Sequence, residues 1–424
     1  MSGETVVYRG GQVWTGAGFA VRDLATADGH IVGLSRVDGT ARVVSLEGRY
    51  VVPAYGNAHT HMAVPMDFAS HRFLDEGVFY SWNPNSNRIP PEGKAFFART
   101  DTFDVALAQG GITSRGGHPE SIFAKVFFRA TKVESLVGDA LHYGDSRAEI
   151  DAALDKLAQQ RADFVKAYLL FSEEYDERHG KAQYWGLHGM NPAHAPYLVE
   201  AAKKRGLKVA FHAETLTDLR IAIDSGAFAI MHMPAYGPIF TDETPEKWAL
   251  TKADARRIAE SGTMVVTTAG LMKGFDGKLN KGPLEAKQRA VQAENLRLLA
   301  RHGATILVGT DNSSEIFTEV EHLASLNAFK PAELLKIVFG TGSRLFPKRR
   351  IGCFEPGCEA DFLVLGGNPV SDIKALRSIE MRIKAGRPVA SVPSKTLPPI
   401  PHQEETSPPA HNEHHSGSGG SHRG

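Results

Sequence analysis

LKVAFHAETLTDLRIAIDSGAFAIMHM, residues 207–233, contains two apolar runs separated by an amphipathic segment. The runs LKVAFHAE and AFAIMHM are short and almost continuously apolar, which is typical of strands that are covered on both faces. Between them, LTDLRIAIDSG places apolar residues at helical spacing and ends on a glycine. A strand–helix–strand unit of this length connects neighbouring parallel strands, so the stretch predicts an α/β fold with a parallel sheet.

The same alternation continues on both sides of this stretch. Further strands are predicted at residues 164–171 (FVKAYLLF), 263–270 (TMVVTTAG) and 304–312 (ATILVGTDN), and further helices at residues 193–206, 252–262 and 283–303. Eight such units would close a barrel. We interpret residues 110–117 (GGITSRGG) as the second strand, while the third strand, somewhere in 122–145, has no clear sequence signal.

Composition restricts the classes of protein to which the chain can belong. The 424 residues are 42% hydrophobic, and 48 Lys and Arg balance 48 Asp and Glu. A net charge of zero argues against nucleic acid as a partner, and no run of about 18 apolar residues predicts a membrane span. Met1 to Gly10 lacks the pattern of a secretory signal. We expect a cytoplasmic protein in which Cys353 and Cys358 are free thiols, with a strained local bridge as the alternative.

His59 and His61 end an apolar run in VVPAYGNAHTH. Side chains two apart on a strand share a face, so both imidazoles would point the same way and could bind a metal ion. A merely polar end of a strand is the alternative interpretation.

Lys166 lies in the middle of the apolar run DFVKAYLLF. An unpaired buried ammonium group is costly, so something must compensate for it. One answer is carboxylation by carbon dioxide to a carbamate that bridges two metals, and another is a side chain that reaches the rim of the barrel. Tyr168 shares the face of Lys166 and is a candidate donor to a substrate carbonyl, unless it serves packing.

Three more candidates stand at predicted strand ends. His212 and His232 are 20 residues apart, which allows one helix and one turn between successive parallel strands, although each could be a core histidine. Asp311 closes ILVGTD, where a carboxylate could bind a metal and exchange protons, or could cap the next helix. His118, in RGGHP, either faces the same site or lies in a surface loop.

These positions resemble the metal-site pattern of the amidohydrolase superfamily, most closely its imidazolonepropionase-related branch. The family pattern is His-x-His on strand one, a carboxylated Lys on strand four, His on strands five and six, and Asp on strand eight. It is matched here over nearly the whole chain, to about residue 390, by His59, His61, Lys166, His212, His232 and Asp311. Two positions depart from it: Pro53-Ala54 replaces the usual Pro-Gly, and Asn57 replaces an acid two residues before the first His.

The resemblance implies a (β/α)8 TIM barrel over residues 54–342 and a small β-sandwich domain built from residues 1–53 and 343–392. The β-rich texture of residues 5–52 and 350–390 agrees with this division. Residues 393–424 are rich in Pro, Gly, Ser and His, which predicts a disordered tail.

The resemblance also implies a binuclear centre of two divalent ions, with zinc as the usual metal. His59, His61 and Asp311 would hold one ion, His212 and His232 the other, and carboxylated Lys166 would bridge them. A metal-bridging hydroxide would attack the substrate carbonyl, and Asp311 would transfer its proton to the leaving nitrogen.

We therefore expect a hydrolase of small molecules that cleaves a non-cyclic amide or peptide-like C–N bond, in a dipeptide, an N-acyl amino acid or an aryl amide or urea. A cyclic-amide hydrolase or deaminase of the same superfamily and a catalytically inactive metal-binding protein are the alternatives. Aromatic residues between positions 62 and 94, in the expected loop after strand one, would line the substrate site or pack that loop onto the barrel. The sequence leaves the oligomeric state open.

Overall fold

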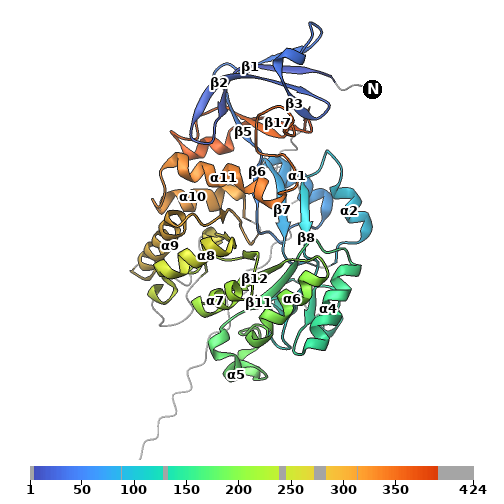
Figure 1. Ribbon diagram of the computed structural model, residues 1–424, viewed down its shortest axis with the longest axis vertical. Coiled ribbons are helices and arrows are strands. Elements are labelled where there is room, and N and C mark those ends of the chain that lie inside the picture. Colours follow the sequence, from blue (N-terminus) through green and yellow to red (C-terminus); the bar gives the residue numbers. More distant parts are fainter. Residues whose placement is uncertain are drawn as a thin grey trace, which may run out of the picture.

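The computed structural model describes residues 4–86, 88–127, 132–237, 245–271, 283–312 and 314–389. The predicted tail, residues 393–424, lies outside these residues. In Figure 1 the strands from the two ends of the chain lie side by side, above a body in which helices surround a second set of strands.

Both ends of the chain contribute to one eight-stranded sheet. Its strands follow the order β18-β17-β16-β5-β1-β2-β3, and β4 pairs with β1. The strands are β1 (Val6–Trp14), β2 (Phe19–Ala27), β3 (His30–Val32), β4 (Arg42–Ser45), β5 (Tyr50–Pro53), β16 (Phe362–Leu365), β17 (Ile379–Lys384) and β18 (Arg387–Pro388). The antiparallel pairing of β16 with β5 joins the ends. The meeting of the termini agrees with the sequence, whereas a separate sandwich with the predicted boundaries stays a prediction.

The remaining strands run parallel. They are β6 (Tyr55–Asn57), β7 (Val78–Asn83), β8 (Asp104–Leu107), β9 (Gly111–Thr113), β10 (Leu141–Tyr143), β11 (Val165–Leu169), β12 (Val209–Ala213), β13 (Ala229–Ile230), β14 (Met264–Val266) and β15 (Ile306–Leu307). One sheet has the order β6-β7-β8 and the other the order β10-β9-β11-β12-β13-β14-β15.

Backbone hydrogen bonds connect these two sheets at both ends. The amide of Ala58, just after β6, donates to the carbonyl of Val308, just after β15, at 2.8 Å. The amide of Asp163, just before β11, donates to the carbonyl of Leu107 in β8 at 2.8 Å. The parallel strands therefore form a closed ring, which is consistent with the expected TIM barrel.

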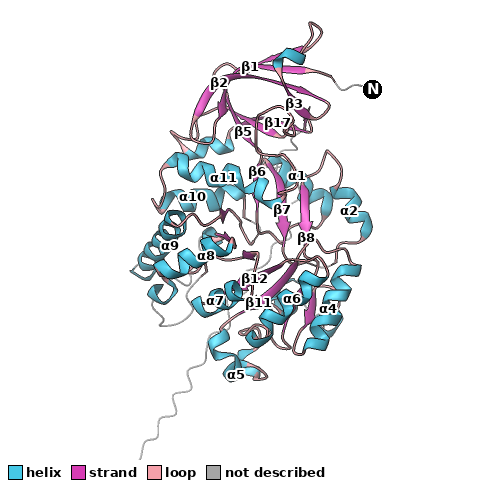
Figure 2. Cartoon of the chain, viewed as in Figure 1, coloured by secondary structure: helices cyan, strands magenta, loops and turns pink. Residues whose placement is uncertain are grey.

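Eleven α-helices accompany the strands in the described residues: α1 (Met66–Asp75), α2 (Pro91–Phe97), α3 (Glu120–Ile122), α4 (Arg147–Gln159), α5 (Tyr175–Arg178), α6 (Ala195–Lys204), α7 (Leu216–Asp224), α8 (Lys252–Ser261), α9 (Pro283–Arg301), α10 (Ile316–Ser325) and α11 (Pro331–Leu345). Figure 2 shows the longer helices on the outside of the strands. The α11 helix approaches β6 so closely that a Cβ on Gly56 would lie 2.6 Å from the backbone nitrogen of Gly342. Glycine at both positions allows this contact.

The assignment of residues 110–117 to the second strand is wrong. β7 occupies that place beside β6, within the segment that the sequence suggested to be a loop. β9 instead follows β8 after three residues, so the two act together as the third strand of the ring. β10 lies in the interval 122–145, but it pairs with β9 beside the ring.

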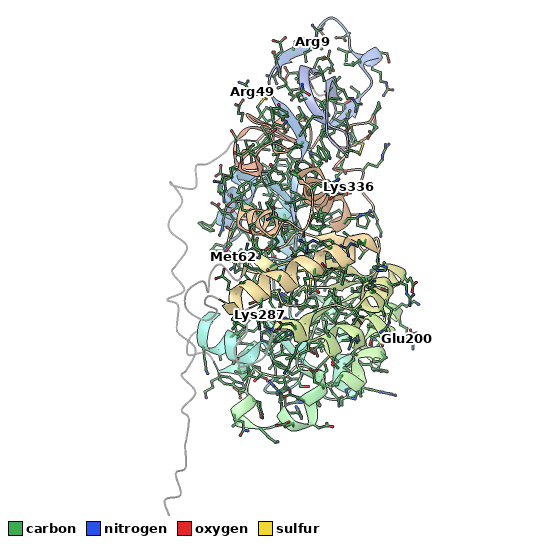
Figure 3. The ribbon with its side chains drawn as sticks, turned by 90° about the vertical axis from the view of Figure 1, so that its left-hand side faces the viewer. Arg9, Arg49, Met62, Glu200, Lys287 and Lys336 are labelled. Atoms are coloured by element: carbon green, nitrogen blue, oxygen red, sulfur yellow. A yellow bond between two sulfur atoms is a disulfide. The ribbon has the colours of Figure 1, made fainter. Side chains whose placement is uncertain are left out.

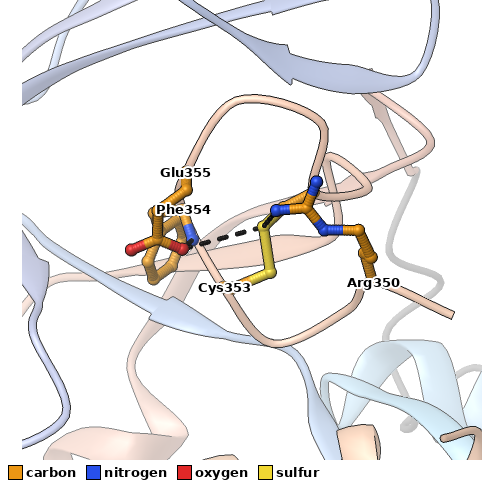
Figure 4. The surroundings of a disulfide bond; sticks show 5 residues. Arg350, Cys353, Phe354 and Glu355 are labelled. Atoms are coloured by element: carbon orange, nitrogen blue, oxygen red, sulfur yellow. Dashed lines mark hydrogen bonds between the residues drawn. A yellow bond between two sulfur atoms is a disulfide. The ribbon is translucent and has the colours of Figure 1, made fainter.

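Cys353 and Cys358 form a disulfide, with Cα atoms 5.9 Å apart, so the expectation of free thiols is wrong. Figure 4 shows the disulfide with Arg350, Phe354 and Glu355 around it. Disulfides are typical of oxidising compartments, so the cysteines do not argue for a cytoplasmic location, which stays a prediction. No helix in the described ranges combines the length and the apolar character that a membrane crossing requires.

Candidate metal centre

The structure brings the six predicted ligands to one end of the barrel. His59 and His61 follow β6, Lys166 lies in β11, His212 in β12, His232 just after β13, and Asp311 shortly after β15. Asn57 ties the first and last of these segments together, because its Oδ1 accepts from the amides of His59 and Thr310, each at 3.2 Å. Figure 3 shows Met62, the residue after His61, between the terminal sheet, marked by Arg9 and Arg49, and Lys287 on α9.

The first three donors converge on one point. His59 Nε2 and His61 Nε2 lie 3.0 and 3.2 Å from Asp311 Oδ1, and 3.2 Å from each other. Tetrahedral zinc with bonds of about 2.0 Å holds its ligands about 3.3 Å apart. The triangle of donor atoms therefore has the size of one face of such a coordination sphere.

Hydrogen bonds fix the tautomers of both imidazoles. His59 Nδ1 lies 3.0 Å from the carbonyl oxygen of Met231, and His61 Nδ1 lies 2.5 Å from that of Asn85. A carbonyl only accepts, so Nδ1 carries the hydrogen, and in the neutral ring each Nε2 presents a lone pair. Two lone pairs and a carboxylate oxygen facing one another repel, unless a cation lies between them.

His212 and His232 extend the centre. Their rings are 4.5 Å apart, and the ligand atoms of His232, His59 and Asp311 all lie within 4.8 Å of one another. Among the described residues, buried His212 Nε2 has no hydrogen-bond partner. Burial lowers the pKa of His59 to about 4 and the pKa values of His212 and His232 well below the usual value, so all three rings are neutral at pH 7, as ligation requires.

Lys166 is 1% exposed, so the alternative that its ammonium group reaches the rim is wrong. It forms no salt bridge in the part of the chain that the structure describes. Burial lowers the pKa of Lys166 to about 7, against the opposing attraction of Asp311. A large fraction of this side chain is therefore a neutral amine near pH 7, which is the form that reacts with carbon dioxide.

Asp311 is not a helix cap, because the next helix, α10, begins at Ile316 and is preceded by Glu315. Its side chain remains 21% exposed, and that of His61 24% exposed, whereas His59, His212 and His232 are buried. A ligand can therefore approach the centre from the side of His61 and Asp311.

Tyr168 and His118 both face the centre. The rings of the two residues are 5.3 Å apart, and the His118 ring lies 4.8 Å from that of His212, so a surface position for His118 is wrong. Asn85 Nδ2 donates to the hydroxyl oxygen of Tyr168 at 2.5 Å. The hydroxyl of Tyr168 can therefore donate its own proton to another acceptor. The expected role of Tyr168 as a donor to the substrate carbonyl requires this.

Two further residues at this end escaped the sequence analysis. Glu214 Oε2 lies 3.4 Å from His212 Nε2 and accepts a hydrogen bond of 2.8 Å from the hydroxyl of Tyr236. The Tyr236 ring stacks on that of His232 at 4.1 Å. Glu214 was detectable, since it shares a strand face with His212 in the same way as His61 does with His59.

Buried amides hold the segment that carries His232 and Tyr236. Gln288 and Gln292 on α9 donate to the carbonyl of Ala235 at 3.0 and 2.7 Å, and Asn295 donates to that of Pro234 at 3.2 Å. These positions repeat at helical spacing and are almost fully buried. The hydrogen bonds satisfy otherwise buried carbonyls and fix the path of the segment.

Four of the five aromatic residues expected after strand one serve packing, and the fifth, Phe68, is half-buried. Phe73, Phe79, Tyr80 and Trp82 lie in α1 and β7 and are almost completely buried in the core. An arginine could anchor a substrate carboxylate, and Arg72, Arg88 and Arg115 are candidates for that role. Arg115 already pairs with Asp145 and Glu149 at 2.5 and 2.6 Å, and Arg72 with Glu76 at 2.9 Å, whereas Arg88 is exposed.

Comparisons with known proteins place this chain in a family and show a shared fold. An imidazolonepropionase from Sphingopyxis alaskensis is 25% identical over 379 residues, which cover 80% of this chain and 85% of that protein. An ochratoxinase from A. niger has a similar fold, with a TM-score of 0.70 and 16% identity over 91% of this chain and 95% of that one. A Xaa-Pro dipeptidase with bound methionine also has a similar fold, with a TM-score of 0.69 and 16% identity over 91% of this chain and 99% of that one. The model of the amidohydrolase family matches residues 50–389, so the protein belongs to the amidohydrolase family.

Proposed function

We propose that the protein is a metal-dependent hydrolase of a non-cyclic amide or peptide-like C–N bond. The substrate would be a dipeptide, an N-acyl amino acid, or an aryl amide or urea. An ochratoxinase and a Xaa-Pro dipeptidase among the structural neighbours support hydrolytic chemistry on this fold.

One observation carries the proposal: three acceptor atoms, of His59, His61 and Asp311, face one another at 3.0 to 3.2 Å with their tautomers fixed for metal binding. The neutral, buried rings of His212 and His232 continue the donor set. Nitrogen and carboxylate ligands of this kind suit zinc. We therefore assign one ion to His59, His61 and Asp311 and a second to His212 and His232.

Carboxylated Lys166 would bridge the two ions. The neutral amine adds carbon dioxide, forming an N–C bond and releasing one proton, and it becomes a carbamate anion. This reaction replaces a buried amine that has no salt-bridge partner among the described residues by a ligand that the cations stabilise, which supports carboxylation at this position.

The bound ions would supply an ionised water near neutral pH and would polarise the substrate carbonyl. Asp311, the carboxylate of the centre, would accept the proton of the attacking water and pass it to the leaving nitrogen. Tyr168 would donate its hydroxyl proton to the carbonyl oxygen, because Asn85 already occupies an acceptor site on that hydroxyl. His118, close to Tyr168 and His212, would contact the substrate on the same side.

Elemental analysis of zinc-reconstituted protein tests the centre. We expect about two equivalents more in the wild-type chain than in a variant with His59, His61, His212 and His232 all replaced by Asn, which serves as the blank for metal bound by tail histidines. One equivalent would point to a mononuclear centre and to the alternative of cyclic-amide hydrolysis or deamination. Equal metal content would refute the centre.

A parallel substrate screen tests the reaction. Dipeptides, N-acyl amino acids and aryl amides should be hydrolysed, and lactams and aminated heterocycles should not. Lys166→Ala should lose both metal and activity, with partial recovery in formate or acetate, because a short carboxylate can take the place of the carbamate. Full activity of Lys166→Ala would exclude the bridging role.

A further inference from the structure

Glu214 is a carboxylate beside the metal centre that the proposed ligand set does not use. It lies two residues after His212, and its Oε2 is 3.4 Å from His212 Nε2. The side chain of Glu214 is 20% exposed, and those of His61 and Asp311 are exposed to a similar extent. Glu214 is therefore within reach of a molecule bound at the centre.

Only one of its two carboxylate oxygens is engaged by the protein. Oε2 accepts from the hydroxyl of Tyr236, while within the described part of the chain Oε1 forms no hydrogen bond. The Tyr236 ring is held by stacking on His232, so the engaged oxygen has a fixed position. The other oxygen is left as an acceptor for a ligand.

The charged side chains near Glu214 leave it open to a cationic ligand. Arg115 and Arg72, two of the arginines that could have bound a substrate carboxylate, form ion pairs of 2.5 to 2.9 Å with internal acids. Glu173 Oε2 accepts from the hydroxyl of Thr215, the residue after Glu214, at 3.0 Å. Neither Glu214 nor Glu173 forms a salt bridge with a lysine or arginine among the described residues, which leaves Glu214 open to a cationic group of a ligand.

We propose that Glu214, oriented by Tyr236, binds a protonated nitrogen of the substrate next to the carbonyl that is attacked. The inference rests on the proposed function and narrows its substrate class to amides that carry an ammonium or amidinium group near the scissile bond, such as amides of unblocked amino acids. A hydrogen bond between charged partners would give selectivity of about tenfold or more over the neutral counterpart.

Two hydroxamates provide a binding test that needs no turnover. Glycine hydroxamate and acetohydroxamate share the metal-binding group, but only the first carries an ammonium group. Their dissociation constants are measured by calorimetry on the zinc-reconstituted wild-type protein, on Glu214→Gln, and on Glu173→Gln as the matched control. We expect glycine hydroxamate to bind about tenfold more tightly to the wild type and to Glu173→Gln, and the preference to fall to about twofold or less in Glu214→Gln.

An unchanged preference in Glu214→Gln, or an equal fall in Glu173→Gln, would overturn the inference while leaving the proposed function intact. Failure of both hydroxamates to bind the zinc-reconstituted wild type would overturn the metal centre and this inference with it. Metal content of the variants gives a separate readout. Glu214→Gln should retain the metal of the wild type, and loss of an equivalent would make Glu214 a ligand and refute the role assigned here.

Activity extends the test to substrates. Glycine p-nitroanilide carries a free ammonium group, its N-acetyl counterpart is neutral and its N-succinyl counterpart is anionic. The wild type should prefer the first in kcat/KM, and Glu214→Gln should reduce this preference at least fivefold, mainly through KM. Preference of the wild type for the succinyl compound would contradict the inference, whereas hydrolysis of none of the three would count against the proposed function.

Discussion

Replacing Lys166 by Met should stabilise the metal-free protein. The lysine is 1% exposed and forms no salt bridge with the described residues, and burial lowers its pKa from 10.5 to about 7. A shift of this size corresponds to about 5 kcal/mol between the two protonation states, of which about 4 kcal/mol opposes folding at pH 7. Methionine has a similar length and no charge, so most of this cost should disappear.

The pH dependence distinguishes this cause from better packing. Between pH 7 and 10.5 the unfolded chain binds more protons at this lysine than the folded chain does, so the stability of the wild type rises with pH. From pH 7 to pH 9 the gain should be about 2 kcal/mol in the metal-free wild type and absent in Lys166→Met. Urea unfolding of chelator-treated protein at the two pH values measures both differences.

Lys384 provides the matched control. It is buried to a similar degree, but its ammonium group pairs with Asp104 at 3.0 Å. Lys384→Met should therefore destabilise the protein by about 1 to 3 kcal/mol, because it weakens a buried ion pair. If Lys166→Met is less stable than the wild type at pH 7, or keeps the same pH slope, the argument from an unpaired buried amine is refuted. With zinc and bicarbonate the order should reverse, since only the wild type binds the full metal complement.

Three further substitutions test other contacts. Tyr168→Phe should lower kcat about 100-fold with little change in metal content, because it removes the donor to the carbonyl oxygen. An unchanged kcat would show that Tyr168 serves packing and not catalysis. Gly309→Ala should cost about 2 to 4 kcal/mol in urea unfolding and weaken metal binding, since its Cβ would lie 2.9 Å from the Cβ of His59; wild-type stability would show that the strand end can shift. Cys353→Ser should lower the free energy of unfolding by about 2 kcal/mol, because the disulfide closes only a short loop and restricts the unfolded chain little. A thiol reductant should lower the stability of the wild type by the same amount and leave the variant unchanged.

The parallel part of the fold could be predicted from the sequence where strands and helices alternate regularly. The helix predicted at 216–226 is α7, and the one at 252–262 is α8, because amphipathic spacing and a capping Thr mark both in the sequence. β7 was missed for the opposite reason. VFYSWN is buried on both faces, so it has no alternation, and its aromatic residues resemble those of a binding loop.

The six candidate ligands could be chosen from the sequence because each of them ends or interrupts an apolar strand. A polar residue at such a place has few structural reasons to be there, and the carboxyl ends of parallel strands meet. Tyr236 and Asn85 lie on loops, where polar and aromatic residues are ordinary and spacing gives no direction. Their positions depend on contacts from distant segments, such as the α9 amides that hold Ala235.

His59 and His61 show what the structure adds to the ligand list. The two histidines are two residues apart, which places both rings on one face of the strand. This spacing does not determine which ring nitrogen can bind a metal ion. The carbonyls of Met231 and Asn85 decide this, because each accepts a hydrogen bond from one Nδ1. Both carbonyls lie in loops that follow other strands. The residues after the first strand can therefore bind a metal ion in this way only when these neighbouring loops are in place. For this reason a substitution that moves either loop should weaken metal binding even when every ligand is retained.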